Sequence, residues 1–171
     1  DARPISHPVK FYERGSRPLE IVATRQWYIR NGGRDAALRD ALIERGDQVA
    51  WHPGYMRHRY DNWVGGLHGD WLISRQRFFG IPFPVWYPLD ANGQPDYVHP
   101  IVAAAATLPV DPTVDVPLGY RTEHRDQPNG FTAEADVYDT WFTSSLTPQI
   151  GSGWLLDPER HATRFPADIR P

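Results

Sequence analysis

Residues 70–87 read DWLISRQRFFGIPFPVWY and carry the clearest fold signal in the chain. Two short apolar runs, Trp71 to Ser74 and Ile81 to Tyr87, are typical of buried strands, and two prolines confine the second run to a sheet edge or a special bend. Between the runs lie three polar residues, Arg75, Gln76 and Arg77. A cationic, hydrogen-bonding loop at the end of a strand suits phosphate or ribose contacts, although a solvated turn has the same composition.

A second compact apolar segment reads DVYDTWFTSSLTP over residues 136–148. Its strand-like start delivers Asp139, Trp141 and several small hydroxyl groups to the end of the strand, which is where open α/β sheets bind ligands. Tryptophan in such a segment is also a common core residue. Residue chemistry alone therefore leaves Trp141 either in the core or beside a ligand.

The N-terminal part of the chain predicts extended structure. Apolar and polar residues alternate from Ile5 to Ile29 and are interrupted at Gly15-Ser16, as in two strands joined by a turn. We therefore expect a β-ribbon here.

Two helices are expected between this ribbon and residue 70. Residues 35–45 have helical spacing, and Gly46 suits the left-handed position that ends a helix. A brief strand is expected at residues 49–51. Pro53 then suits the first turn of a second helix. The apolar face of that helix would hold Met56, Tyr60, Trp63, Val64 and Leu67.

The C-terminal half is rich in turns. Residues 88–134 contain many Gly, Pro and Asn residues and only short strand-like pieces, which indicates a loop-rich insertion. Residues 135–146 return to a compact apolar segment. Residues 148–171 are expected to be mostly irregular, with a short helix near residues 157–162.

Composition excludes several classes of protein. The 171 residues include no cysteine, which removes disulfide scaffolds, thiol nucleophiles and cysteine–zinc sites. No apolar stretch approaches the roughly 20 residues that cross a bilayer, and no secretory signal is visible, so we expect a soluble, cytoplasmic protein without a membrane partner. The net charge of −3 means that any contact with nucleic acid must be local.

The chain lacks a self-contained catalytic motif. It has no phosphate-binding loop with a Lys-Ser or Lys-Thr ending, no Gly-x-Gly-x-x-Gly, no His-Glu-x-x-His and no Gly-x-Ser-x-Gly. Its seven histidines are scattered. We therefore assign no catalytic and no metal-binding residue.

The two apolar segments together resemble signatures of class I aminoacyl-tRNA synthetases. Ile-Ser-Arg-Gln-Arg, two aromatics, Gly and Pro-x-Pro-Val-Trp-Tyr at residues 73–87 are similar to a signature of the valyl and isoleucyl enzymes. Residues 136–145 resemble their Asp-Val-x-Asp-Thr-Trp-Phe-x-Ser-Ser block, and Ser-Leu-Thr-Pro at 145–148 favours the valyl group. Residues 9–28 and the helix carrying Arg59, Tyr60 and Trp63 are weaker matches.

This resemblance implies an α/β fold: the second half-portion of a Rossmann-like class I synthetase catalytic domain, with an N-terminal β-ribbon and a small, loop-rich β insertion. Residues 1–30 would be the ribbon at the exit of the editing insertion, and residues 31–87 helices and strands of the catalytic domain. Residues 88–134 would be the insertion, and residues 135–171 the return to the catalytic domain.

The resemblance also implies a function for the longer enzyme of which this chain would be an internal fragment. That enzyme would activate valine with ATP and Mg²⁺ and transfer it to tRNA(Val). Trp141 would form a wall of the valine pocket and Asp139 would orient its surroundings. Arg75 and Arg77 would contact the acceptor end of tRNA, with Gln76 shaping that loop, although intramolecular salt bridges are an equal alternative for both arginines.

Departures from the family pattern limit what this chain can do alone. The loops of many relatives carry paired cysteines that hold zinc, and residues 88–91 and 123–126 have none, so we expect no zinc. The His-x-Gly-His and Lys-Met-Ser-Lys-Ser types of ATP-binding motif are also missing. The chain by itself is therefore predicted to be inactive and to need the rest of the synthetase chain.

Three alternatives stay open on sequence. The first is a fragment of an isoleucyl enzyme. The second is a free-standing RNA-binding module that uses Arg75 and Arg77 with stacking aromatic side chains. The third is a glycan-binding β-module that uses the seven tryptophans as flat platforms, against which the two expected helices argue.

Overall fold

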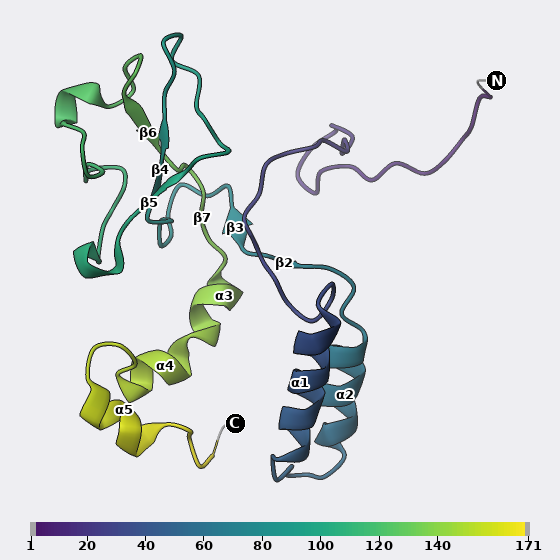
Figure 1. Cartoon of the computed structure of the whole chain (residues 1–171). Coiled ribbons are helices and arrows are strands. Elements are labelled where there is room, and N and C mark those ends of the chain that lie inside the picture. Colours follow the sequence, from purple (N-terminus) through teal and green to yellow (C-terminus); the bar gives the residue numbers. More distant parts are fainter. Residues whose placement is uncertain (1–2, 170–171) are drawn as a thin grey trace.

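The computed structural model describes residues 3–169, so residues 1, 2, 170 and 171 of the outermost predicted segments lie outside it. The described residues form short strands at the centre, a small sheet with long loops above them, and two separate groups of helices below (Figure 1). The N-terminal segment runs away from the rest (Figure 1). The expected mixture of helix and strand is confirmed.

Two short strand pairs form the centre. β1 (Tyr28–Ile29) pairs with β2 (Trp71–Leu72), and β3 (Ser74–Arg75) pairs with β7 (Val137–Tyr138), both antiparallel. The amide of Ile73 also donates to the carbonyl of Trp27 at 2.9 Å. Three segments that are far apart in sequence therefore meet at one place.

The hydrophobic core lies around these strands. Four buried residues contact one another, namely Ile73, Phe83, Val85 and Tyr87. Aromatic rings close the cluster: Phe83 stacks on Trp27 with ring centroids 5.5 Å apart and lies 3.9 Å from Tyr138. Such aromatic pairs bury large areas and are worth about 0.5–1.5 kcal/mol beyond the burial itself. The core thus ties both predicted motif segments to the end of the N-terminal segment.

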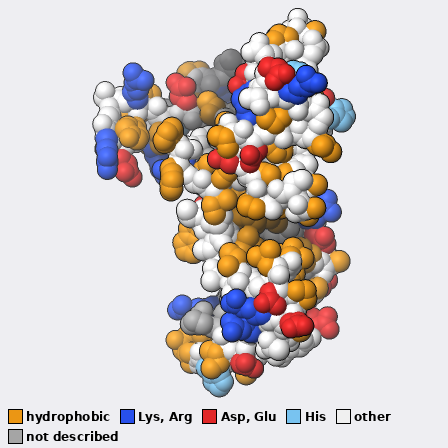
Figure 2. Space-filling view, turned by 90° about the vertical axis from the view of Figure 1, so that its left-hand side faces the viewer, with side chains coloured by type: hydrophobic (Ala, Val, Ile, Leu, Met, Phe, Trp, Pro, Cys, Tyr) orange, Lys and Arg blue, Asp and Glu red, His pale blue; other side chains and the backbone are white. Residues whose placement is uncertain are grey.

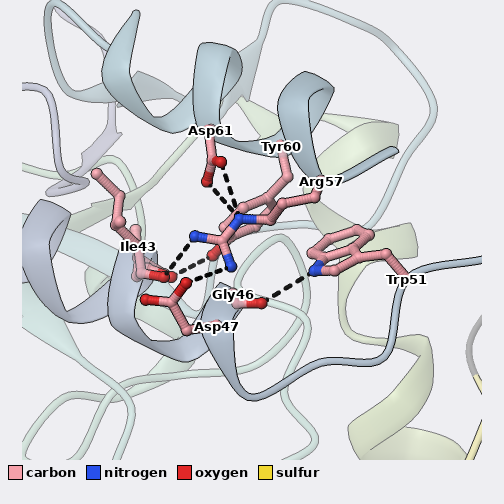
Figure 3. A network of polar contacts seen from close by, with 8 residues as sticks. Ile43, Gly46, Asp47, Trp51, Arg57, Tyr60 and Asp61 are labelled. Atoms are coloured by element: carbon pink, nitrogen blue, oxygen red, sulfur yellow. Dashed lines mark hydrogen bonds and ion pairs between the residues drawn. The ribbon is translucent and has the colours of Figure 1, made fainter. Parts of the chain in front are cut away.

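The predicted helix pair is present as an antiparallel hairpin of α1 (Ala36–Asp47) and α2 (Met56–Gly65). Asp35 caps α1 by accepting from the amide of Leu38. Arg57 of α2 bridges to α1 through Asp47 at 2.7 Å and is held by Asp61, one turn along α2 (Figure 3). The Arg57 guanidinium therefore connects the two helices through the bonds that it donates.

Three details of this hairpin were predicted wrongly. Gly46 does not end α1 but lies buried within it, because its bare Cα faces the ring of Tyr60. Residues 49–51 are not a strand; the indole of Trp51 folds back and donates to the carbonyl of Gly46 (Figure 3). α2 begins at Met56, since the carbonyl of Pro53 accepts from the Met56 amide in a preceding turn.

The loop-rich insertion is built on a three-stranded antiparallel sheet in the order β5 (Ile101–Val102), β4 (Val85–Pro88) and β6 (Phe131–Ala133). β4 is central, so of the two alternatives that the prolines left open, a sheet edge or a special bend, the edge is wrong. Pro82 and Pro84 lie before the residues of β4 that pair with β5 and β6, so neither proline interrupts these pairings.

The long loops of the insertion include two short 3₁₀ helices, η1 (Ala105–Thr107) and η2 (Thr122–His124). The loop between these two helices is held by side chains that donate to its carbonyls. Trp86 and Arg125 both donate to the carbonyls of Pro112 and Asp115. Phe131 is completely buried under this loop.

The predicted β-ribbon is present only in part. One bridge joins Phe11 to Pro18, with hydrogen bonds between Tyr12 and Arg17 and between Lys10 and Leu19. Apart from a turn at residues 13–16, the other residues from 3 to 27 belong to no helix and no strand. An isolated pair of strands is marginal in water, and no described helix or sheet covers this one.

The C-terminal part is more helical than expected. α3 (Thr140–Ser145) and α4 (Thr147–Ser152) follow β7 directly, and α5 (Pro158–Arg164) matches the predicted short helix. Pro148 lies in the first turn of α4, where a missing amide hydrogen costs nothing. The Ser152 hydroxyl lies 2.9 Å from Nδ1 of His161 and connects α4 to α5.

Candidate functional site

The two motif segments meet where β3 lies beside β7. Asp139 follows β7, is buried, and its amide donates to the carbonyl of Ile73 at 2.7 Å. Nη2 of Arg75 lies 3.4 Å from Oδ1 of Asp139, and Nη1 donates to the carbonyl of Ser74. The structure thus brings Arg75 and Asp139 together in an ion pair, which is the intramolecular alternative left open by the sequence for Arg75.

Trp141 lies in the first turn of α3 and does not belong to the core. Its side chain is 77% exposed, whereas the next residue, Phe142, packs edge-on against Trp71 with ring centroids 5.8 Å apart. Of the two alternatives for Trp141, a place in the core is therefore wrong within residues 3–169. A large exposed indole next to a buried carboxylate is available to bind a ligand or another part of a protein.

A hydrogen-bonded chain joins three segments at the end of β3. The buried Ser74 hydroxyl accepts from the amide of Trp27 at 2.9 Å and donates to Oε1 of Gln26 at 2.7 Å. Gln76 donates from Nε2 to the same Gln26 oxygen and, at 2.8 Å, to Asp136. Gln76 thereby connects the start of the loop that follows β3 to Gln26 and Asp136.

Glu134 is a second junction, and no sequence motif pointed to it. Its Oε2 accepts from the indole of Trp27 and from the hydroxyl of Tyr87, and its Oε1 accepts from the amide of Asp136. Burial, together with the hydrogen bond to Glu134, raises the pKa of Tyr87 well above its usual range. Only the folded chain reveals this residue, because its partners are up to 107 positions away.

An open hollow of about 590 Å³ lies between residues 22–28 and residues 72–76. Arg75 and Gln76 contribute to its wall together with Tyr28 and Leu72. Trp141 and Arg77 do not line it. The predicted site residues therefore lie on two neighbouring surfaces rather than in one cavity.

The loop after Gln76 projects from the molecule. Arg77 is exposed and has no hydrogen bond or ion pair to any residue between 3 and 169, in contrast to Arg75. Phe78 and Phe79 are also fully exposed, and sequence analysis did not single them out. The sequence could have indicated this exposure, because the two aromatic residues directly follow three polar ones. Two neighbouring aromatic side chains cannot both point inward from so short a loop. Gly80 returns the chain, with its Cα packed against Val137.

Metal binding and membrane insertion find no support in the described part of the chain. No three His, Asp or Glu side chains gather within residues 3–169 in a way that could hold a metal ion. None of the described helices is long and apolar enough to cross a bilayer. The groups that do gather are an ion pair, side-chain amides and exposed aromatic faces, which are suited to binding.

Comparison with known proteins gives these surfaces a context. The family of class I tRNA synthetases (I, L, M and V) matches residues 13–170, which include both motif segments and the whole site. The chain belongs to this family. The family resemblance stated from residues 73–87 and 136–148 is thereby confirmed.

Several curated relatives of this class I tRNA synthetase chain share the name "Valine--tRNA ligase". The chain is 60% identical to a "Valine--tRNA ligase" of Salinispora tropica over 99% of its own length. It is also 60% identical to that of Salinispora arenicola over all of its own length. A "Valine--tRNA ligase" of Thermobifida fusca is 60% identical over 98%. The chain spans about a fifth of the length of these relatives. The preference for the valyl over the isoleucyl group is confirmed.

Proposed function

We propose that this chain is part of a valine–tRNA ligase, in which it supplies walls of the amino-acid pocket and contacts to the acceptor end of tRNA. The observation that carries the proposal is the junction of β3 and β7, which brings the two family segments together through Arg75 and Asp139. Identity of 60% to valine–tRNA ligases over nearly the whole chain supports the assignment to valine. The predicted cytoplasmic location agrees with this function.

Within that enzyme, Trp141 would pack against the side chain of valine. Its exposure beside the ordered end of β7 supports this role, because an indole face that is not used in the core can receive an apolar ligand. Asp139 would act indirectly: its carboxylate is held by Arg75 and its carbonyl accepts from Thr143, so it fixes the start of the helix that carries Trp141.

The arginines would have different roles. Arg75 already contacts Asp139 and the carbonyl of Ser74, which suits a positioning residue. Arg77 is exposed next to two exposed aromatic rings, and a guanidinium beside aromatic faces is a common way to hold the phosphates and bases of an RNA end. We therefore assign the contact with tRNA mainly to Arg77, with Gln76 fixing the loop.

ATP and Mg²⁺ belong to other parts of the proposed ligase. Carboxylates within residues 3–169 do not gather in a way that would hold the ion, and the chain lacks both ATP-binding motifs. What this chain would contribute is position: a substrate held in a fixed orientation reacts far faster than a free one, without any covalent intermediate. A Rossmann-like sheet would likewise be completed by strands from the longer enzyme.

The test is a chimera in which this chain replaces the matching fifth of the Salinispora tropica enzyme. Trp141→Ala should raise the KM for valine in ATP–pyrophosphate exchange by about ten-fold or more, because an apolar pocket contact is worth about 1–3 kcal/mol. Trp63→Ala is the matched control, since Trp63 is 76% exposed and lies on α2. Equal KM values for the two variants would count against the proposal.

The same chimera tests the RNA contact separately. Arg77→Gln should raise the KM for tRNA in the charging reaction and leave valine-dependent exchange unchanged, because exchange needs no tRNA. A loss of exchange in this variant would place Arg77 at the amino-acid pocket instead.

A further inference from the structure

Charge is divided unevenly along the chain. Residues 1–34 hold seven Lys and Arg residues against three acidic ones, whereas residues 35–171 hold eleven against eighteen. The net charge of −3 therefore conceals a basic segment at one end. Such an asymmetry is a physical reason to look for an anionic partner at that end.

The hairpin at residues 10–19 arranges these charges in a specific way. Tyr12 donates its amide to the carbonyl of Arg17, and Leu19 donates to Lys10, which fixes the register around the bridge of Phe11 and Pro18. Residues directly opposite in an antiparallel pair share one face, and successive residues alternate. One face of this hairpin therefore carries Lys10, Tyr12, Arg17 and Leu19.

This face, which we call the cationic face, holds two positive charges around one aromatic ring. The two acidic residues nearest to the hairpin, Glu13 and Glu20, alternate away from this face in register. Lys10 and Arg17 form no ion pair with any carboxylate of residues 3–169, and both side chains are exposed. The ring of Tyr12 is more than half exposed.

We propose that the cationic face of the hairpin binds the sugar–phosphate backbone of RNA, with Tyr12 stacking on a base. Cations spaced around an exposed aromatic ring on an extended element are the arrangement with which proteins hold single-stranded nucleic acid. This surface differs from the loop at Arg77. It rests on the proposed function only for the identity of the RNA, which would be tRNA.

The test measures binding of a fluorescently labelled single-stranded RNA of about 12 nucleotides to the full 171-residue chain over a range of salt concentrations. For the double variant Lys10→Gln/Arg17→Gln, the slope of log K against log salt should fall by about 1.4, because each lost phosphate contact removes about 0.7. The control is Arg59→Gln/Arg164→Gln, which removes the same charge from exposed positions on α2 and α5. Equal slopes for the two variants would overturn the proposal, as would a chain that binds no RNA.

Tyr12 has its own matched control in Phe11. The two rings are exposed to 57% and 55%, yet lie on opposite faces of the hairpin. Tyr12→Ala should weaken binding by about ten-fold with an unchanged salt slope, and Phe11→Ala should have little effect. Equal losses would overturn the assignment of the face. A chimera that charges tRNA while the hairpin variants bind RNA normally would refute this inference alone and leave the proposed function in place.

Discussion

Ser74 shows how a buried polar side chain organises this site. The residue is 1% exposed, and its hydroxyl accepts from the amide of Trp27 and donates to Gln26. A buried donor that loses its partner costs the full desolvation of that group, so the hydroxyl cannot be removed without consequence. The single side chain thus connects the end of the N-terminal segment to β3.

We expect Ser74→Ala to lower the free energy of unfolding by about 1–3 kcal/mol, because the Trp27 amide loses its acceptor in a buried position. Ser144→Ala is the control: that hydroxyl bonds only to the carbonyl of Trp141 in its own helix and is exposed. It should change stability by less than about 0.5 kcal/mol. Urea unfolding followed by tryptophan fluorescence compares the two, and an equal effect would contradict the role given to Ser74.

Tyr87 predicts a dependence of stability on alkaline pH. Burial and the hydrogen bond to Glu134 raise its pKa in the folded chain, whereas tyrosine in an unfolded chain titrates near about 10. Below that pH the tyrosine is neutral in both states and its contribution to stability is fully present. As pH rises above it, only the unfolded chain loses the proton, so the free energy of unfolding falls. Urea midpoints on either side of this pH should show the fall.

Tyr87→Phe should make this alkaline fall shallower, since phenylalanine has no proton to lose. The substitution keeps the ring and its packing in the core, so any change in slope belongs to the hydroxyl. An alkaline slope that stays the same in this variant would show that other groups cause it.

At the scale of elements, the α1–α2 hairpin is held together by its own contacts. Arg57 bridges the two helices (Figure 3). The hydroxyl of Tyr60 donates to the carbonyl of Leu42 across the interface. Trp51 packs against Tyr60 with ring centroids 5.2 Å apart and closes the connection. The close approach of Tyr60 depends on glycine at position 46, where a Cβ would lie 2.5 Å from the ring.

We expect Gly46→Ala to destabilise the hairpin by about 1–3 kcal/mol, because the added methyl overpacks the interface. In an unconstrained helix the same change stabilises by about 0.5–1 kcal/mol, so the sign itself is diagnostic. Gly65→Ala, at the end of α2 with open space around it, is the matched control and should be neutral or stabilising. Thermal unfolding followed by helical circular dichroism distinguishes them. A stabilising Gly46→Ala would show that Tyr60 moves away easily.

At the scale of the whole molecule, the amount of exposed surface is the main feature. The chain exposes 14164 Å², whereas a monomeric protein of 19.6 kDa exposes about 8,600 Å². Apolar side chains are visible over much of the face drawn in Figure 2. Exposed aromatic and aliphatic residues also occur in several helices and in the loops between elements, among them Trp63, Phe78 and Trp141. These surfaces are suited to contact with further polypeptide of the proposed ligase.

We expect the isolated chain to bind a hydrophobic dye such as ANS and to unfold in urea with a slope at the low end of about 1–3 kcal/mol/M, because folding removes little surface from water. The same residues in the chimera should bind far less dye. The isolated chain should also give no valine-dependent pyrophosphate exchange. Exchange by the chain alone would contradict the proposal that other parts of the enzyme bind ATP.

The sequence by itself determined the family and most of the local elements. Motif order at residues 73–87 and 136–148 identified a class I synthetase, helical spacing located α1 and α2, and a short helix was expected at the position of α5. These features depend on neighbours in the chain, so they can be recognised without the fold. Predictions from local sequence were wrong at Gly46 and at residues 49–51. There the contact of Gly46 with Tyr60 and the hydrogen bond of the Trp51 indole outweigh local preference.

Only the tertiary structure decided which residues meet. Arg75 pairs with Asp139, and Glu134 bonds to Trp27, so both contacts join segments that are dozens of residues apart. The exposure of Trp141 also depends on how the rest of the chain packs. The central position of β4 and the incomplete β-ribbon could not be predicted from local sequence either, because a strand is stabilised by its partner strands and not by its own sequence. The physical reason is common to all of them: burial and hydrogen bonding between distant segments depend on how the whole chain packs.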